Sequence, residues 1–175
     1  MEYKRLDDFY LPVHKAYTVL DGIFLLRDGE QIVDIIGAGE FIHKASGQYS
    51  SNLAVHCIQS GTLTEAENPD AFSFRRQHEK LTLLTRALTT NKLDARILKL
   101  LQWFGKYFGE PVGDIHVTIP KLTQKEISEI TNSCRPSVTR LVKQLEDKNL
   151  LRRCSKIISA VVREEYMSSS TIHAA

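Results

Sequence analysis

The chain has 175 residues, of which 42% are hydrophobic and 25% charged, a composition that fits a soluble globular protein of one large or two small domains. No apolar run approaches the roughly 20 residues of a membrane-spanning helix, and no signal peptide is visible, so we expect a cytoplasmic protein without a membrane partner. Residues 1–76 carry 7 basic against 11 acidic residues and residues 121–165 carry 10 against 6, which favours a polyanion as partner of the C-terminal part, although a solvated basic face gives the same pattern.

The N-terminal part has the pattern of β-strands. Apolar runs at residues 19–26 and 31–36 flank Asp28-Gly29, which is a strong signal for a hairpin. A second pair of strands is predicted at residues 51–58 and 62–66, with Gly61 at the turn. Because these strands are too few for a complete barrel of about eight strands, the sequence predicts a shortened, jelly-roll-like β-barrel over residues 1–76.

The next segment, residues 72–108, has no proline and predicts helices. Its apolar residues recur at spacings of 3, 4 and 7, so they form a stripe that packs either on its own domain or on the same helix of a second copy. We predict a homodimer through residues 77–92, with a hinge near residues 91–93 and a second helix, Ala95–Phe108, capped by Asp94. The predicted dimer interface consists of Leu81, Leu84, Leu88, Asn91 and Ala95.

A helix-start signal follows at residues 122–127. Thr123 and Glu126 are spaced for a capping box, in which each side chain accepts a hydrogen bond from the backbone N–H of the other residue. Leu122 and Ile127 occupy the two positions of a hydrophobic staple around it. These residues predict a short helix that reaches about Ile130.

A polar turn at residues 131–134 leads into a second helix. Pro136 suits the first turn of that helix but disfavours a helical conformation before it, which leaves open whether Arg135 lies in the helix or just before it. Two β-like runs, 150–152 and 157–162, flank a basic turn and complete a winged helix-turn-helix over residues 93–165, before a flexible tail at 166–175. The predicted buried face of the second helix consists of Val138, Leu141, Val142 and Leu145.

The polar residues of this segment suit double-stranded DNA. A helix fits the major groove, where an arginine can donate two hydrogen bonds to guanine, and hydroxyl, amide and ammonium groups hold phosphates. The fold class is therefore α+β, with a C-terminal DNA-binding domain. The predicted DNA-binding residues are Thr123, Gln124, Arg135, Pro136, Ser137, Thr139, Arg140, Lys143, Arg152, Arg153 and Lys156.

Three segments, Leu122–Ile127, Cys134–Leu141 and Leu145–Leu151, resemble the DNA-binding signature of the cyclic-AMP receptor protein/fumarate-nitrate regulator superfamily, closest to its global nitrogen regulators. The resemblance extends more weakly to the long helix and to Gly22–Ile42. It implies a dimeric transcription regulator whose long helix forms a coiled coil and which contacts RNA polymerase if it activates. It also implies that Arg135 and Arg140 read bases, whereas Pro136 stands where many members have a base-reading glutamate.

The effector part departs from the family. No arginine lies between Phe41 and Leu53, where the family holds a cyclic phosphate, so we expect no cyclic nucleotide and no other cofactor. The family's four-cysteine iron–sulfur arrangement is missing as well. His14, His43 and His56 are scattered, which predicts no metal site.

The sequence bears on two other functions. An enzyme is not expected, because the sequence has no glycine-rich phosphate loop, no nucleophile elbow and no metal-spaced cluster of His and Glu. A redox- or ligand-sensing regulator is the alternative hypothesis, in which DNA binding is switched through the β domain or through Cys134 in the turn and Cys154 in the wing. Cys57 lies in the β domain.

Overall fold

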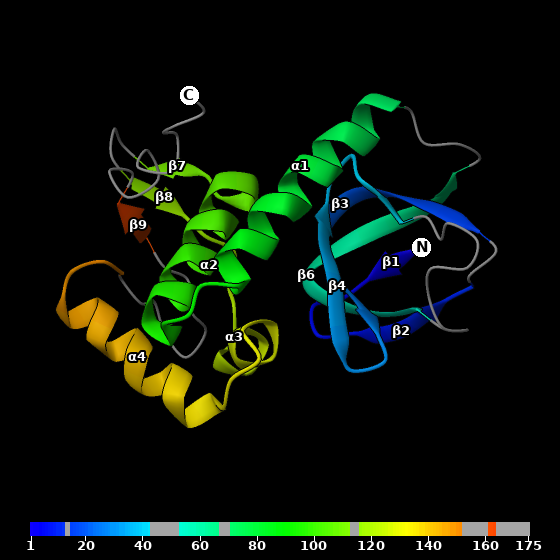
Figure 1. Ribbon diagram of the computed structural model, residues 1–175. Coiled ribbons are helices and arrows are strands. Elements are labelled where there is room, and N and C mark those ends of the chain that lie inside the picture. The colour runs from blue at the N-terminus through cyan, green and yellow to red at the C-terminus, as the bar shows by residue number, and fades with distance from the viewer. Residues whose placement is uncertain (13–14, 43–52, 67–70, 113–115, 152–160, 164–175) are drawn as a thin grey trace. The chain divides into compact units, whose positions relative to one another are not determined.

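The computed structural model describes residues 1–12, 15–42, 53–66, 71–112, 116–151 and 161–163 (Figure 1). The chain divides into two compact units, Met1–Leu81 and Thr82–Ala175. The first unit contains an antiparallel sheet and the second contains the helix-turn-helix, so the predicted α+β class is confirmed. In the part of the chain that the structure describes, no helix is both long and apolar enough to cross a membrane.

A single six-stranded antiparallel sheet forms the core of the first unit. Its central order is β1-β6-β3-β4, with β2 paired to β6 and β5 paired to β3. The two long strands, β3 and β6, pair along most of their length and carry the other strands. The strands are β1 (Glu2–Tyr3), β2 (Asp8–Leu11), β3 (Ala16–Asp28), β4 (Gln31–Gly37), β5 (Phe41–Ile42) and β6 (Leu53–Ala66).

The predicted hairpin is confirmed, because β3 and β4 pair up to Asp28 and Gln31 and Gly29 takes a left-handed φ of 60° in the turn. The second predicted turn is wrong. β6 runs without interruption through Gly61, where a Cβ atom would lie 2.2 Å from the carbonyl oxygen of Asp21 and 2.6 Å from the Cα atom of Gly22. Gly61 therefore permits a close approach of two strands, which is the other common use of a strand glycine.

Polar side chains from α1 (Ala71–Leu88) cover the outer edge of β4. Lys80 is 1% exposed, and its ammonium group contacts the Glu40 carboxylate and donates to the carbonyl oxygen of Ile35. Gln77 Nε2 donates to Asp34 Oδ2 at 2.9 Å and to the carbonyl oxygen of Phe41 at 3.0 Å. These side chains satisfy backbone groups that an edge strand would otherwise leave open for another strand.

Two more bonds complete this edge. Asp34 Oδ1 accepts from the backbone N–H of Ile35 at 2.7 Å, and Glu40 Oε2 accepts from the N–H of Gly37 at 2.7 Å. Asp34 and Glu40 are both buried. Burial raises the pKa of Asp34 above its ordinary value of 3.8, although Lys80 and the hydrogen bond from Gln77 act in the opposite direction.

The raised pKa of Asp34 predicts a pH-dependent stability. A carboxyl group whose pKa is higher in the folded than in the unfolded protein binds its proton more tightly when folded, so its burial destabilises the fold above the folded pKa, and this penalty disappears as the pH falls toward 3.8. We expect Asp34→Asn to lack this contribution. The free energy of urea unfolding, compared between the two proteins over a pH series, should show the wild type gaining relative to Asp34→Asn as the pH falls. A difference that stays constant or shrinks would contradict the assignment.

The second unit consists of helices and a small sheet. Its core comes mainly from α2, which buries Ile97, Leu100, Leu101, Trp103 and Phe104. A three-stranded antiparallel sheet of order β7-β8-β9 belongs to the same unit. The elements are α2 (Leu93–Phe108), β7 (Pro111–Val112), β8 (His116–Thr118), α3 (Gln124–Ile130), α4 (Arg135–Asp147) and β9 (Val161–Arg163).

A break between two helices is found where the hinge was predicted, because α1 ends at Leu88 and α2 begins at Leu93. The predicted cap is wrong. Lys92 is the N-cap residue without a side-chain bond, whereas Asp94 lies in the first turn and accepts from the N–H of Ala95 at 2.8 Å. An acidic side chain is favourable in a first turn as well as at a cap. The break places Ala95 on a different helix from Leu88, so the predicted stripe is not continuous.

The C-terminal hairpin was predicted only in part. Leu150 and Leu151 lie outside any strand, and residues 152–160 are outside the described part of the chain. β9 pairs with β8. The sequence does not predict β7 or β8, because strands of 2 and 3 residues show no periodicity. Gly109 permits the turn between α2 and β7, since a Cβ atom there would lie 2.2 Å from the carbonyl oxygen of Thr118.

Candidate nucleic-acid interface

The start of α3 is fixed by the predicted capping box. Thr123 Oγ1 accepts from the N–H of Glu126 at 3.1 Å, and the Glu126 carboxylate accepts from the N–H of Thr123. Leu122 and Ile127 are fully buried beside it, as a hydrophobic staple requires. Gln124, the first residue of α3, therefore has a well-defined backbone position.

The turn between α3 and α4 is closed by buried polar groups. Thr131 is fully buried; its hydroxyl donates to the carbonyl oxygen of Ile127 at 2.6 Å and lies 2.7 Å from the Ser133 hydroxyl. Asn132 takes a left-handed φ of 48°, which suits an asparagine. Arg96 of α2 donates to the carbonyl oxygen of Thr131 from Nη1 and to that of Thr90 from Nε, each at 2.9 Å. Sequence reasoning missed Arg96, because no local pattern marks such a long-range contact.

α4 buries one face, as predicted. Val138, Val142 and Leu145 are at most 4% exposed, and Leu141 is half-buried. Cys134 is the N-cap residue, so Arg135 is the first residue of α4. This settles the question that the sequence left open. The first N–H groups of a helix have no partner within it, so Pro136 in this turn costs no hydrogen bond.

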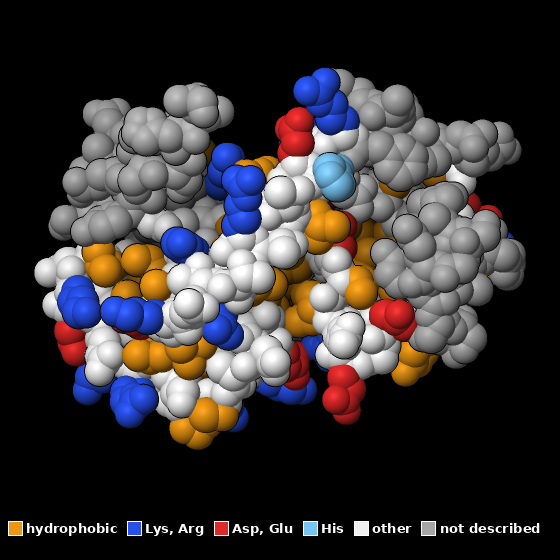
Figure 2. All heavy atoms as spheres, viewed as in Figure 1, with side chains coloured by type: hydrophobic (Ala, Val, Ile, Leu, Met, Phe, Trp, Pro, Cys, Tyr) orange, Lys and Arg blue, Asp and Glu red, His pale blue; other side chains and the backbone are white. Residues whose placement is uncertain are grey.

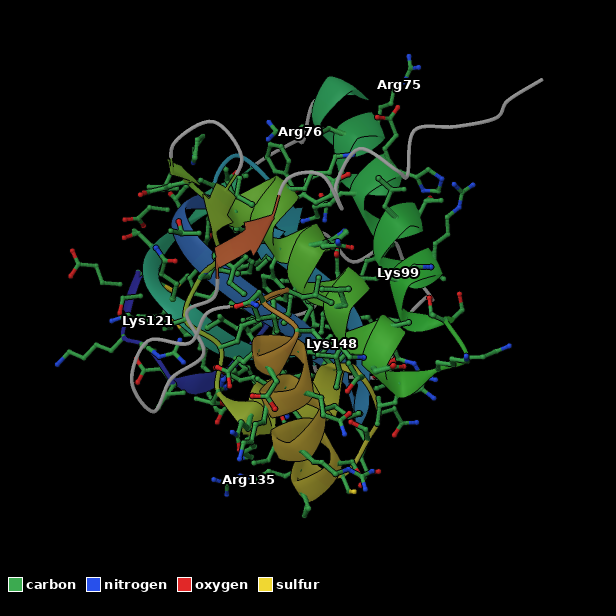
Figure 3. The ribbon with its side chains drawn as sticks, turned by 90° about the vertical axis from the view of Figure 1, so that its left-hand side faces the viewer. Arg75, Arg76, Lys99, Lys121, Arg135 and Lys148 are labelled. Atoms are coloured by element: carbon green, nitrogen blue, oxygen red, sulfur yellow. The ribbon has the colours of Figure 1, made fainter. Side chains whose placement is uncertain are left out.

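α4 turns a polar and basic side toward solvent. Arg135 projects outward from the N-terminal end of the helix, and Lys148 lies just beyond the other end (Figure 3). Several Lys and Arg side chains lie at the surface in the region of α4 (Figure 2). Of the residues predicted to bind DNA, Ser137, Thr123 and Gln124 are half-buried, and the exposed ones are Arg135, Pro136, Thr139, Arg140 and Lys143.

Two polar contacts join residues on this side. Thr139 Oγ1 lies 2.5 Å from Gln124 Oε1 on α3 and 3.0 Å from the carbonyl oxygen of Arg135. Cys134 Sγ lies 3.1 Å from the Ser137 hydroxyl. That hydrogen bond, supported by the N–H of Ser137 and by the positive charge of Arg140, lowers the pKa of the exposed Cys134 thiol below its ordinary value of 9.0.

The remaining candidates fall in two groups. The first group lies outside the described part of the chain. It consists of Arg152, Arg153, Lys156, Cys154, His14 and His43, together with residues 43–52 of the expected cyclic-phosphate cassette. His56 is buried with Nδ1 2.8 Å from Asp8 Oδ1. Cys57 is also buried, which raises the pKa of its thiol to about 11. Among the residues that the structure describes, no group of three or more His, Cys, Asp or Glu could hold a metal ion.

Comparison with known proteins agrees with this geometry. Residues 95–163 match the Crp-like helix-turn-helix domain family. A search by sequence among curated proteins finds no match.

Solved structures share the fold over most of the chain. A CRP-family transcriptional regulator from Thermus thermophilus has a TM-score of 0.72 at 16% identity and covers 100% of both chains. A CRP/FNR-family regulator from the same organism has a TM-score of 0.71 at 19% identity, covering 97% of this chain and 96% of its own. A protein from Listeria monocytogenes that contains a cyclic nucleotide-binding domain has a TM-score of 0.74 at 12% identity, covering 95% and 89%. The resemblance predicted from the sequence is therefore confirmed: residues 95–163 match the Crp-like helix-turn-helix domain family, and the chain shares the fold of solved CRP/FNR-family transcription regulators.

Proposed function

We propose that the protein is a sequence-specific regulator that binds double-stranded DNA as a homodimer and places the N-terminal half of α4 in the major groove. The observation that carries this proposal is α4 itself. One side is buried in the domain core, while the other exposes Arg135, Thr139, Arg140 and Lys143. A helix with base-reading residues in its first turns is how this motif reads DNA.

The polar residues of this surface divide into those proposed to contact bases and those proposed to contact phosphates. Arg135 and Arg140 each carry a planar guanidinium that can donate two hydrogen bonds to one guanine. Thr123, Gln124 and Ser137 are half-buried and Lys143 is exposed, and we expect them to supply hydroxyl, amide and ammonium donors to the DNA. Pro136 has neither donor nor acceptor in its side chain, so it makes no polar contact with a base. The basic residues Arg152, Arg153 and Lys156 of the predicted wing would add phosphate contacts.

The arginine-free segment Phe41–Leu53 supports a regulator that does not use a cyclic nucleotide. A cyclic phosphate needs a positively charged or strongly donating partner when it leaves water. The chain would contact RNA polymerase if it activates transcription.

Arg140→Ala tests the DNA-reading role, with Lys148→Ala as a matched control that also removes one positive charge at α4. Loss of Arg140 should cost about 1–3 kcal/mol per half-site and relax the preference at one base position, because a base contact disappears. Loss of Lys148, just beyond the far end of α4, should leave the base preference unchanged. Each protein is titrated with the best site selected from random DNA and with its single-base variants, at several salt concentrations. If Arg140→Ala weakens all sequences equally, Arg140 is a phosphate contact instead.

We place the dimer interface on α1. Leu81 and Leu88 lie two turns apart on one face and are half-buried within a single chain, so a second copy could cover the remainder. Leu84 is 2% exposed and supports this face from inside the chain. Asn91 is exposed in the break after α1, and Ala95 is half-buried on α2; both would flank the seam.

Leu88→Asp tests this interface. A charge in an apolar seam loses its hydration, and we expect dimerisation to weaken by about 2–5 kcal/mol, as for large changes in a core. Thr82→Asp, at an exposed position of the same helix, should leave the dimer intact. Sedimentation velocity at micromolar concentration reports the mass of each protein. A Leu88→Asp protein that remains a dimer would exclude α1 as the interface.

A redox-switched regulator is the second candidate, because the Cys134 thiol is exposed at the N-cap of α4 and its pKa is lowered. A larger thiolate fraction favours reaction with peroxide. We expect peroxide to weaken DNA binding and dithiothreitol to restore it. Cys134→Ser should bind DNA and resist peroxide, whereas Cys154→Ser should respond like the wild type. A wild type whose DNA affinity is unchanged by peroxide would remove this candidate.

A further inference from the structure

A hydrogen bond between α3 and α4 lies on the surface that is proposed to face DNA. The Thr139 hydroxyl lies 2.5 Å from Gln124 Oε1. Gln124 is the first residue of α3, and its backbone is fixed by the capping box of Thr123. Thr139 is exposed and lies on α4 between Arg135, one turn before it, and Arg140, its immediate neighbour.

The arrangement decides which end of the Gln124 amide points away from Thr139. A hydroxyl has one proton to donate, and a carboxamide has one oxygen acceptor and one nitrogen with two donors. The carbonyl oxygen of Arg135 is a second acceptor within reach of that proton, at 3.0 Å. The contact with Gln124 Oε1 is the shorter one, at 2.5 Å. With the proton placed there, Nε2 is the end of the amide that remains, and among the described residues it has no hydrogen-bond partner. The result is an oriented N–H donor on the surface of the helix-turn-helix.

We propose that Gln124 donates a hydrogen bond to an acceptor atom of DNA and that Thr139 is its positioning residue, acting through the Gln124 oxygen and without a DNA contact of its own. The inference rests on the proposed function and deepens it, because Thr139, which was expected to contact DNA, instead acts through Gln124. DNA offers such acceptors at phosphate oxygens and at the N7, O6 and O4 atoms of the major groove. An amide that is held in place before binding loses less rotational freedom when it meets its acceptor, so Thr139 contributes to affinity.

A double-mutant cycle on the full-length protein tests the coupling. The proteins are wild type, Thr139→Val, Gln124→Ala and the double variant, and the dissociation constant is measured on the best selected site. Thr139→Val keeps the shape of the side chain and removes the hydroxyl; it should weaken binding about three- to tenfold, as for the loss of one hydrogen bond. In the Gln124→Ala background the same change should have no further effect. Thr139→Ser retains the hydroxyl and should restore most of the affinity.

A role confined to folding would not produce this pattern, and thermal unfolding of all variants verifies that each is folded. Gln124→Glu provides a second variant, because it keeps an acceptor for Thr139 but replaces the outward donor by a negatively charged acceptor. It should bind more weakly than Gln124→Ala. If Thr139→Val weakens binding equally with and without Gln124, or if Gln124→Glu binds as well as the wild type, the proposal is overturned.

Two further measurements identify the acceptor and separate the two proposals. If Gln124→Ala changes the preference at one base position, the acceptor is a base; if it weakens all sequences equally, the acceptor is a phosphate. Arg140→Ala is measured beside the cycle. A wild-type protein that binds no DNA would refute the proposed function. The positioning role alone would be refuted if binding is selective and depends on Arg140, but the effects of Thr139→Val and Gln124→Ala on the dissociation constant are independent of each other.

Discussion

The helix-turn-helix depends on how its buried turn is closed. At Thr131 the chain leaves α3, so the carbonyl oxygen is no longer paired within a helix, yet the residue is fully buried. Arg96 donates to this oxygen and, with a second nitrogen, to the carbonyl oxygen of Thr90 after α1. A buried carbonyl without a partner would cost about 1–3 kcal/mol. The guanidinium satisfies the buried carbonyl of Thr131 and also bonds that of the half-buried Thr90, and thereby ties the break before α2 to the turn before α4.

The first unit solves a related problem at the edge of its sheet. Lys80, Gln77 and the acidic groups of Asp34 and Glu40 pair with backbone atoms of β4 and β5. A buried lysine is tolerated only when its charge is paired and hydrogen-bonded, and both conditions are met here. Hydrogen bonds are directional, so these contacts form only when Gln77 and Lys80 of α1 have one position relative to the sheet. They therefore position this part of α1 more specifically than apolar packing would.

What the sequence predicted well is local. The capping box, the buried face of α4 and the break after α1 each follow from residues within a few positions of one another. The errors have two physical sources. Gly61 and Asp94 belong to residue types with two uses, a turn or a close approach for the glycine and a cap or a first-turn charge for the aspartate. The contacts of Arg96 and Lys80, and the pairing of β8 with β9, exist only because distant segments meet, and no local pattern encodes such a meeting.

The contrast between local patterns and contacts of distant segments also bears on the base specificity of the protein. Arg135 and Arg140 sit on a helix whose position is fixed, so their reach follows from the fold, whereas the proline between them removes one polar contact that relatives are expected to make. A binding surface that lacks one donor or acceptor discriminates less at that base unless another group replaces it. Under the proposal for Gln124, its amide nitrogen would supply such a donor from α3 if the acceptor is a base, since its oxygen is engaged by Thr139. In that case both helices together would set the base preference of the protein, and the bond between Thr139 and Gln124 would determine how far α3 contributes.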